Sequence, residues 1–413
     1  MKSVLLIGTL DTKGPEIGYL RDRLRAFGVG AIVADSGILG EPIDIVPDVT
    51  RQDVATLGGT TIDALRNAGS RGKAVHGMLA GLRALAIDLF AKGKLHAVAT
   101  LGGAEGAVLG ASAMMVLPIG IPKVIVTPIA SGHRKFGPLV GTKDVMVVHS
   151  VIDILGLNPI SRAVFDNVAA ALAGMVTNAA HQIALDRSQR RIAVTMLGQT
   201  TAAVMKVRDA LARHGFEAVV FHANGVGGPA MEELAEQGLF EGVIDYTTNE
   251  LSGEIQKGYH DAGPDRLRRI GRIGLTQVVV PGGIDFATHG RPDAIPQGLQ
   301  GRPVYYHNPE FTLVRTSAEE MRELGRRFAD RLNEASGPLV VMVPTAGLSI
   351  PNVPGGLFWD PAADAGFLEE MRANLRPDIQ VTTHDAHVNA PEFAELVAER
   401  FVTLLNEEKD RRS

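Results

Sequence analysis

The chain opens with a continuous apolar run, a polar turn and then apolar residues at helical spacing. Residues 4–7 are all apolar and predict a buried strand, and the polar residues 8–14 predict a turn. Apolar side chains then recur every three or four residues, at Ile17, Leu20, Leu24 and Phe27. Gly28 predicts the end of this helix, and residues 31–34 predict a second strand that closes on Asp35.

The same order returns near the middle of the chain. Residues 192–195 predict a strand, and the helix face after it carries Val204, Val207 and Leu211. Gly215 ends that helix, and residues 218–221 predict a strand that closes on His222. The match runs through strand, turn, helix end and second strand, so the chain reads as two structurally related halves.

Further short apolar runs alternate with helical patterns in both halves. They occupy residues 97–101, 123–127, 242–246, 277–280, 304–306 and 339–343. This alternation is typical of parallel sheets with right-handed crossovers. We therefore expect an α/β protein of two tandem Rossmann-like domains with mostly parallel sheets, residues 1–187 and 188–413, joined by the polar segment 186–191.

Composition narrows the possible partners. The 413 residues carry a net charge of −5 and only 5% aromatic residues, so the basic and aromatic surface that nucleic acids require is not expected. The chain has no cysteine, which excludes disulfides and thiolate metal sites and fits a cytoplasmic location. The most apolar stretch, residues 107–117, stops at Pro118 before it could cross a bilayer, so no membrane partner is expected.

Glycine-rich turns follow several of the predicted strands. They include Gly8 with Gly14, the pair Gly102-Gly103, Ser131-Gly132, residues 225–228 and the pair Gly282-Gly283. In a parallel sheet such turns meet at the carboxyl edge, where helix N-termini attract anions. The alternative is that a tight strand–helix turn needs glycine whatever the function. Several such turns at one edge favour a site for a phosphate-bearing ligand.

The turn at residues 8–14 offers the chemistry of a nucleotide site. Asp11, Thr12 and Lys13 could hold Mg²⁺ and a phosphate, although Lys13 stands before the last glycine and not after it, as a Walker A loop requires. Asp35 could accept a hydrogen bond from a ribose hydroxyl, or it could stabilise its own turn. Residues 225–230 fit the dinucleotide fingerprint but follow the second strand of their half.

Together these motifs resemble one family. The residues that carry the resemblance are 8–14, 102–103, 117–123, 130–132, 221–223 with 227–228, and 307–309 with 315–316. They look like the ATP-binding domain family named after the tomato mosaic virus resistance protein, over essentially the whole chain. The resemblance implies two Rossmann-like domains, a homodimer, and ATP with Mg²⁺ in the first domain. The expected cofactor-binding residues are Gly8, Thr9, Asp11, Thr12, Lys13, Asp35, Gly102, Gly103, Ser131 and Gly132.

The second half gathers ionisable residues at its strand ends. His222, Glu250 and Asp285 are candidates for acid–base chemistry, and Arg315 could clamp a carboxylate or phosphate. Glu250 could instead sit in the first turn of a helix, and His307 could satisfy backbone groups. The sequence leaves the metal ligands undetermined.

Three functions follow from these features. The first is an ATP- or nucleotide-binding protein that acts on a small anionic metabolite in the cleft between its domains. The second is a lyase or hydrolase of a small carboxylate or phosphate metabolite that uses no nucleotide. The third is a non-catalytic regulatory protein that responds to a ligand. The sequence leaves open whether the chain is an enzyme.

Overall fold

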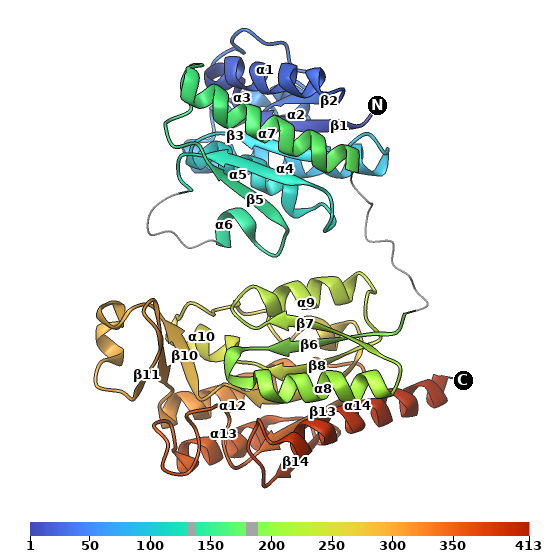
Figure 1. Cartoon of the computed structure of the whole chain (residues 1–413), viewed down its shortest axis with the longest axis vertical. Coiled ribbons are helices and arrows are strands. Elements are labelled where there is room, and N and C mark those ends of the chain that lie inside the picture. Colours follow the sequence, from blue (N-terminus) through green and yellow to red (C-terminus); the bar gives the residue numbers. More distant parts are fainter. Residues whose placement is uncertain (131–136, 179–188, 413) are drawn as a thin grey trace. The chain divides into compact units, whose positions relative to one another are not determined.

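The computed structural model describes residues 1–130, 137–178 and 189–412. The chain divides into two compact units, Met1–Ala184 and Leu185–Ser413, each of which is described by itself (Figure 1). Each unit has a parallel sheet and buried apolar clusters of its own. The expected α/β class with mostly parallel sheets is therefore confirmed.

The N-terminal unit is built on a five-stranded parallel sheet in the order β2-β1-β3-β4-β5. The strands are β1 (Ser3–Gly8), β2 (Gly30–Asp35), β3 (Ala97–Leu101), β4 (Lys123–Thr127) and β5 (Val145–His149). The helices are α1 (Leu10–Ala26), α2 (Arg51–Leu57), α3 (Ile62–Arg66), α4 (Arg71–Ala91), α5 (Ala104–Met115), α6 (Gly137–Val140) and α7 (Pro159–Asn178). Strands β3 and β4 are buried throughout, which explains their nearly continuous apolar sequences.

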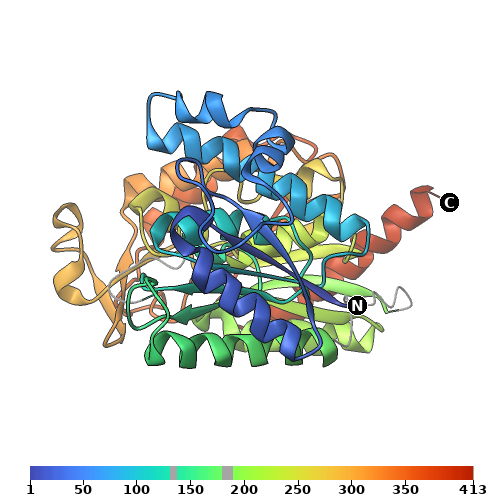
Figure 2. The ribbon, with the colours of Figure 1, turned by 90° about the horizontal axis from the view of Figure 1, so that it is seen from above.

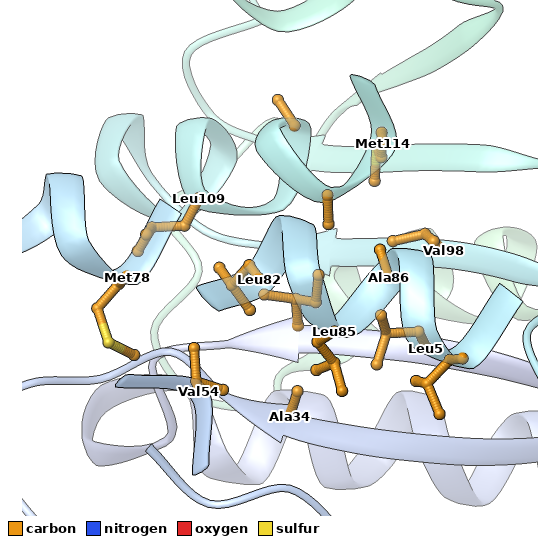
Figure 3. Packing of buried hydrophobic residues seen from close by; sticks show 14 of the residues in the cluster. Leu5, Ala34, Val54, Met78, Leu82, Leu85, Ala86, Val98, Leu109 and Met114 are labelled. Atoms are coloured by element: carbon orange, nitrogen blue, oxygen red, sulfur yellow. The ribbon is translucent and has the colours of Figure 1, made fainter. Parts of the chain in front are cut away.

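Helices cover both faces of this sheet. On one face Leu5 packs with Leu82 and Leu85 of α4 (Figure 3). Its neighbour Leu6 points to the other face and packs in the cluster that α1 and α7 contribute. Figure 2 shows α4 on one side of the sheet and α1 with α7 on the other. This winding leaves the carboxyl ends of the strands as the free edge of the unit.

One helix is long and apolar enough to cross a membrane by length and composition alone. It is Gly72–Ala91, which is almost all of α4. Its side chains Met78, Leu82 and Ala86 are fully buried against the sheet. Core packing accounts for part of its apolar character, since 33% of the window is buried, and most of the stretch 107–117 lies in the shorter helix α5.

The C-terminal unit has two sheets. The larger is parallel, in the order β14-β13-β9-β8-β6-β7, and the smaller is antiparallel, in the order β10-β12-β11. The strands are β6 (Arg191–Met196), β7 (Glu217–His222), β8 (Gly242–Thr247), β9 (Thr276–Gly282), β10 (Phe286–His289), β11 (Val304–Asn308), β12 (Phe311–Arg315), β13 (Leu339–Pro344) and β14 (Gln380–His384). The α-helices are α8 (Thr201–Arg213), α9 (Gly227–Glu236), α10 (Glu250–Gln256), α11 (Arg269–Arg272), α12 (Ala318–Leu332), α13 (Pro361–Asn374) and α14 (Pro391–Arg412), and the short 3₁₀ turn η1 (Gly198–Thr200) precedes α8.

The small antiparallel sheet was not expected. Residues 304–306 do form a strand, but β11 pairs with β12 in a hairpin and not with the parallel sheet. Asn308 closes the hairpin, because its side chain accepts hydrogen bonds from the backbone of Glu310 and Phe311 at 2.9 Å each. Helix α12 begins with a capping box, in which Ser317 and Glu320 form reciprocal side-chain-to-backbone hydrogen bonds.

Close packing of α4 on α2 gives a first testable prediction. A Cβ atom at Gly81 would lie 1.8 Å from the backbone oxygen of Val54, whereas one at Gly72, in the same helix, would meet nothing within 4 Å. Gly81→Ala should lower the free energy of unfolding of the N-terminal unit by about 1–3 kcal/mol. Gly72→Ala, the matched control, should raise it by up to about 1 kcal/mol because alanine favours helix. Urea denaturation followed by circular dichroism measures both, and equal effects would contradict the packing.

Candidate functional site

The carboxyl edge of the N-terminal sheet contains a pocket. Strand β2 lies on one side of β1, and strand β3 lies on the other side. The direction in which successive strands are added to the sheet therefore reverses between β1 and β3. Ligands of open α/β sheets bind at this switch point. A pocket of about 430 Å³ lies there, and its lining includes Thr9 and Asp11 after β1, Gly37 after β2 and Glu105 after β3.

The pocket combines oxygen donors, one cation and an apolar wall. The oxygen donors are Thr9, Asp11, Thr12, Ser70 and Glu105, the apolar side chains are Ile38, Leu39, Leu65 and Ala74, and glycines 37 and 69 complete the lining. Arg66 is the cation among the lining residues. It lies at the end of α3 and donates to the backbone oxygens of Ile38 at 2.9 Å and Leu39 at 3.2 Å. Arg66 thereby ties the loop after β2 to this wall.

The start of α1 is held in place by its own side chains and by the loop after β2. The hydroxyls of Thr9 and Thr12 lie 2.9 Å apart, and the Oδ2 atom of Asp11 accepts a hydrogen bond from the backbone of Gly40 at 3.0 Å. The polar turn expected over residues 8–14 is therefore mostly the first turn of a helix that already begins at Leu10.

Several expected cofactor residues have other partners. The Lys13 ammonium donates to the backbone oxygen of Ile154, and Lys13 is not among the described residues that line the pocket. A side chain at Gly8 would collide with Ile17, and one at Gly102 would collide with Gly106, so both glycines are explained by helix packing. Gly103 is the N-cap residue of α5. Ser131 and Gly132 lie outside the described residues.

Asp35 is a structural residue and is not free to bind a ribose. Its carboxylate accepts from Arg51 Nε at 2.7 Å, from Gly37 N at 2.9 Å and from Leu10 N at 3.2 Å. Both charged side chains are almost completely buried. The sequence could not show this pairing, because Arg51 approaches from the helix that follows the long loop after β2.

In the C-terminal unit a carboxylate of the protein itself occupies the glycine loop of residues 225–228. Glu250 Oε1 accepts from Gly225 N at 2.8 Å and from Gly228 N at 3.1 Å. A Cβ atom at Gly228 would lie 2.0 Å from Glu250 Oε2. The glycines that resembled a dinucleotide fingerprint thus make room for Glu250, whose carboxylate occupies the backbone N–H groups of this loop.

Glu250 belongs to a buried ionic network around Arg266. The guanidinium contacts Glu250 at 2.5 Å, Asp245 at 2.6 Å and 2.7 Å, and Glu232 at 3.0 Å. All four side chains are at most 1% exposed. Burial raises the pKa of Glu232 to about 7 although Arg266 opposes the shift. Glu250 is therefore engaged within the fold, and its assignment as an acid–base catalyst stays a prediction.

Arg315 is likewise engaged and does not present an open anion clamp. It donates to Asp364 Oδ1 at 2.7 Å, to Thr316 Oγ1 at 2.8 Å and to the backbone oxygens of Phe358 at 2.9 Å and Asp285 at 3.0 Å. The side chain is 5% exposed. These bonds fix the end of β12 against the loop that contains Phe358.

Asp285 follows β9 and is fully buried. Ser349 Oγ donates to its Oδ2 atom at 2.5 Å, and its Oδ1 atom has no hydrogen-bond partner among the described residues. Burial raises the pKa of Asp285 to about 6, against the attraction of Arg315. A fully enclosed carboxyl group cannot reach a substrate in this conformation, so its expected catalytic role stays a prediction that would require opening.

His222 is the expected catalytic residue that does lie at an open edge. It is exposed at the end of β7, where it pairs in register with Met196 of β6. His260 lies beside it. The sequence pattern did not identify His260 as a candidate, because it lies in the irregular segment after α10. Burial, together with the nearby His222 and His307, lowers the pKa of His260 to about 4. Among the described residues, no group of three or more His, Asp or Glu side chains is arranged to hold a metal ion.

Known proteins are similar in sequence to this chain over nearly its whole length. Residues 2–181 and 189–405 match the N- and C-terminal domains of the family described as "Uncharacterised protein family (UPF0261)". A Clostridium tetani protein named UPF0261 protein is 35% identical over 98% of this chain and 99% of its own length. The tomato (Solanum lycopersicum) protein named ToMV resistance protein Tm-1(GCR237) is 33% identical over 97% of this chain, which covers 55% of that protein.

A solved structure gives only a distant match. The UDP-GlcNAc 2-epimerase of Methanocaldococcus jannaschii, in complex with UDP-GlcNAc and UDP, aligns at 9% identity with a TM-score of 0.22. The alignment covers 68% of this chain and 83% of that one. It adds nothing to the strand order and the pocket described above.

Replacement of Arg266 should lower the free energy of unfolding of the C-terminal unit more than replacement of an exposed arginine. Arg266→Met leaves three buried carboxylates without their cation, which should lower the free energy of unfolding by about 3–5 kcal/mol near neutral pH. Arg208→Met, in an exposed pair with Asp209, should cost at most about 1 kcal/mol. Urea denaturation followed by the fluorescence of Trp359, the single tryptophan, measures both. Similar costs for the two variants would show that the network is not stabilising.

The pKa of Asp285 predicts a pH dependence of stability. The folded state holds a proton on this carboxyl up to about pH 6, whereas the ordinary pKa is 3.8. Asp285 therefore contributes stability below its ordinary pKa, and that contribution is lost as the pH rises through about 6, by about 3 kcal/mol in total. Asp285→Asn should become more stable relative to the wild type as the pH rises from about 4 to 6, with no further change above it. Urea titrations across this range test it, with the exposed aspartate in Asp293→Asn as the control.

Proposed function

The chain belongs to the UPF0261 family, and we propose that its N-terminal unit binds a nucleotide, ATP with Mg²⁺, in the pocket at the β1–β3 switch point. The observation that carries this proposal is the meeting of Asp11, Glu105 and Arg66 around one pocket at the edge where open α/β sheets bind ligands. The resemblance to an ATP-binding family supports the same ligand.

The donor set fits a magnesium nucleotide. Mg²⁺ prefers hard oxygen ligands and is usually held by one or two carboxylates together with substrate phosphates. Asp11 and Glu105 supply two carboxylates in the pocket lining, and Thr9 and Thr12 supply hydroxyls. Without a cation these carboxylates would repel a polyphosphate, so the nucleotide and Mg²⁺ are proposed to enter together.

The rest of the lining suits the other parts of a nucleotide. Arg66 carries a guanidinium that can pair with phosphate oxygens, and its contacts to the loop after β2 hold it at the pocket. The apolar wall, which includes Leu39 and Leu65, suits the face of a base. Bound Mg²⁺ would supply neutralisation of the phosphate charge, while these residues orient the ligand.

Calorimetric titration with ATP and Mg²⁺ tests this proposal. The wild type should bind, and Asp11→Asn and Arg66→Met should each weaken binding roughly tenfold or more, which corresponds to about 1.4 kcal/mol or more. Asp22→Asn and Arg25→Met change the same residue types on the exposed part of α1 and should leave the affinity unchanged.

Two outcomes would overturn the proposal. One is the absence of binding heat with millimolar ATP and Mg²⁺ in the wild type. The other is equal affinity in Asp11→Asn, Arg66→Met and the two controls, since the pocket would then not be where the nucleotide binds. A requirement for Mg²⁺ is checked by repeating the titration with EDTA, in which binding should fall sharply.

A further inference from the structure

The C-terminal unit has its own switch point, and imidazole groups gather there. In the parallel sheet, β7 lies on one side of β6 and β8 lies on the other. His222 ends β7 beside the end of β6. His307 reaches the same place from β11, since a Cβ atom at Gly198, just after β6, would lie 3.8 Å from its Cε1 atom.

His260 completes the group from the β8 side. Its Nδ1 atom lies 2.9 Å from Asn249 Oδ1, and Asn249 follows β8 directly. Its backbone approaches the loop after β7, since a Cβ atom at Gly225 would lie 3.0 Å from the His260 carbonyl carbon. The three imidazoles therefore come from three different segments and converge above one switch point.

The hydrogen bonds of Asn249 determine which nitrogen of His260 is free. The Asn249 amide nitrogen donates to the backbone oxygens of Gly283 at 2.6 Å and Phe286 at 2.7 Å, which fixes the orientation of the carboxamide. Its oxygen can only accept, so His260 Nδ1 carries the hydrogen, which Thr288 Oγ1 at 3.2 Å can also accept, and Nε2 is an acceptor. No described residue forms a hydrogen bond with Nε2. The protein thus builds a neutral imidazole with its lone pair available.

We propose that His222, His260 and His307 form a second ligand site, which binds a small oxyanion that also carries a hydroxyl group, such as hydrogen phosphate. The hydroxyl donates to His260 Nε2, and the anionic oxygens accept from His222 and His307. A fully deprotonated anion fits less well, because its oxygens would face the His260 lone pair. The lowered pKa of His260 agrees with this arrangement, since burial and the two neighbouring imidazoles keep the ring neutral.

His222 and His307 are suited to the anionic part of the ligand. Both side chains are exposed, and no described residue forms a hydrogen bond with either ring. Each is therefore free to turn toward a ligand without loss of an internal contact. The site lies within the C-terminal unit and does not depend on the nucleotide pocket.

Titration of the full chain with inorganic phosphate tests the second site. Binding is measured by calorimetry, and long-range ¹H–¹⁵N spectra of histidine-labelled protein show which rings respond. We expect phosphate to bind and to shift the signals of all three histidines. The double variant His222→Ala/His307→Ala should lose affinity roughly tenfold or more, while His214→Ala, an exposed histidine after α8, should bind as the wild type does.

The role of His260 has its own readout. In the free protein its spectrum should show the Nδ1–H tautomer, and Asn249→Ala should abolish that preference. His260→Gln removes the imidazole acceptor and should weaken phosphate binding while circular dichroism shows a folded chain. If His260→Gln fails to fold, the tautomer of His260 in the free protein and the phosphate affinity of the double variant still test the proposed site.

Several results would overturn the second site. They are no phosphate binding by the wild type, equal affinity in the double variant and His214→Ala, or an Nε2–H tautomer at His260. Phosphate titration of Arg66→Met separates this site from the nucleotide pocket. Binding should be unchanged in that variant, and its loss would place the phosphate in the N-terminal unit and overturn the second site.

Discussion

Buried ion pairs organise the carboxyl edge of both sheets. In the N-terminal unit, Asp35 joins Arg51 to the backbone at the start of α1. In the C-terminal unit, Arg266 joins the carboxylates of α9, β8 and α10. A buried charge without its partner costs several kcal/mol, so each pair fixes the turns around it. Both candidate ligand sites are formed by polar residues at these edges that take no part in the buried ion pairs.

The strands and the repeat could be predicted because they depend on local apolar pattern. Strands β3 and β4 end where the apolar runs end, and both sheets wind in the same order through their first five parallel strands. The antiparallel sheet between β9 and β13 interrupts that repeat in the C-terminal unit. Its strand β11 looks like any other apolar run, so only the pairing of β11 with β12 distinguishes it.

The site could be predicted only in part, because long-range pairing decides which polar residues remain available. Thr9, Asp11 and Thr12 line the pocket, and their role as cofactor-binding residues stays a prediction. Glu250 looked equally suited to chemistry, yet its carboxylate is held by two backbone groups and Arg266. Nothing in the local sequence around His260 marks it, since its significance comes from Asn249 and from the two neighbouring imidazoles. The homodimer and the cytoplasmic location stay predictions.

The two switch points share geometry but differ in electrostatics. In the alignment of the two halves, Asp35 corresponds to His222, so an acidic strand end in one unit is replaced by an imidazole in the other. The N-terminal pocket adds Asp11 and Glu105 to its lining, which makes a cation necessary before a polyphosphate can approach. At the C-terminal edge, Glu232, Asp245 and Glu250 are engaged by Arg266, and the exposed imidazoles there can accept a proton or donate to an anion directly. Two sheets of the same strand order thus present different side chains at their switch points, because internal ion pairs engage different groups at each edge.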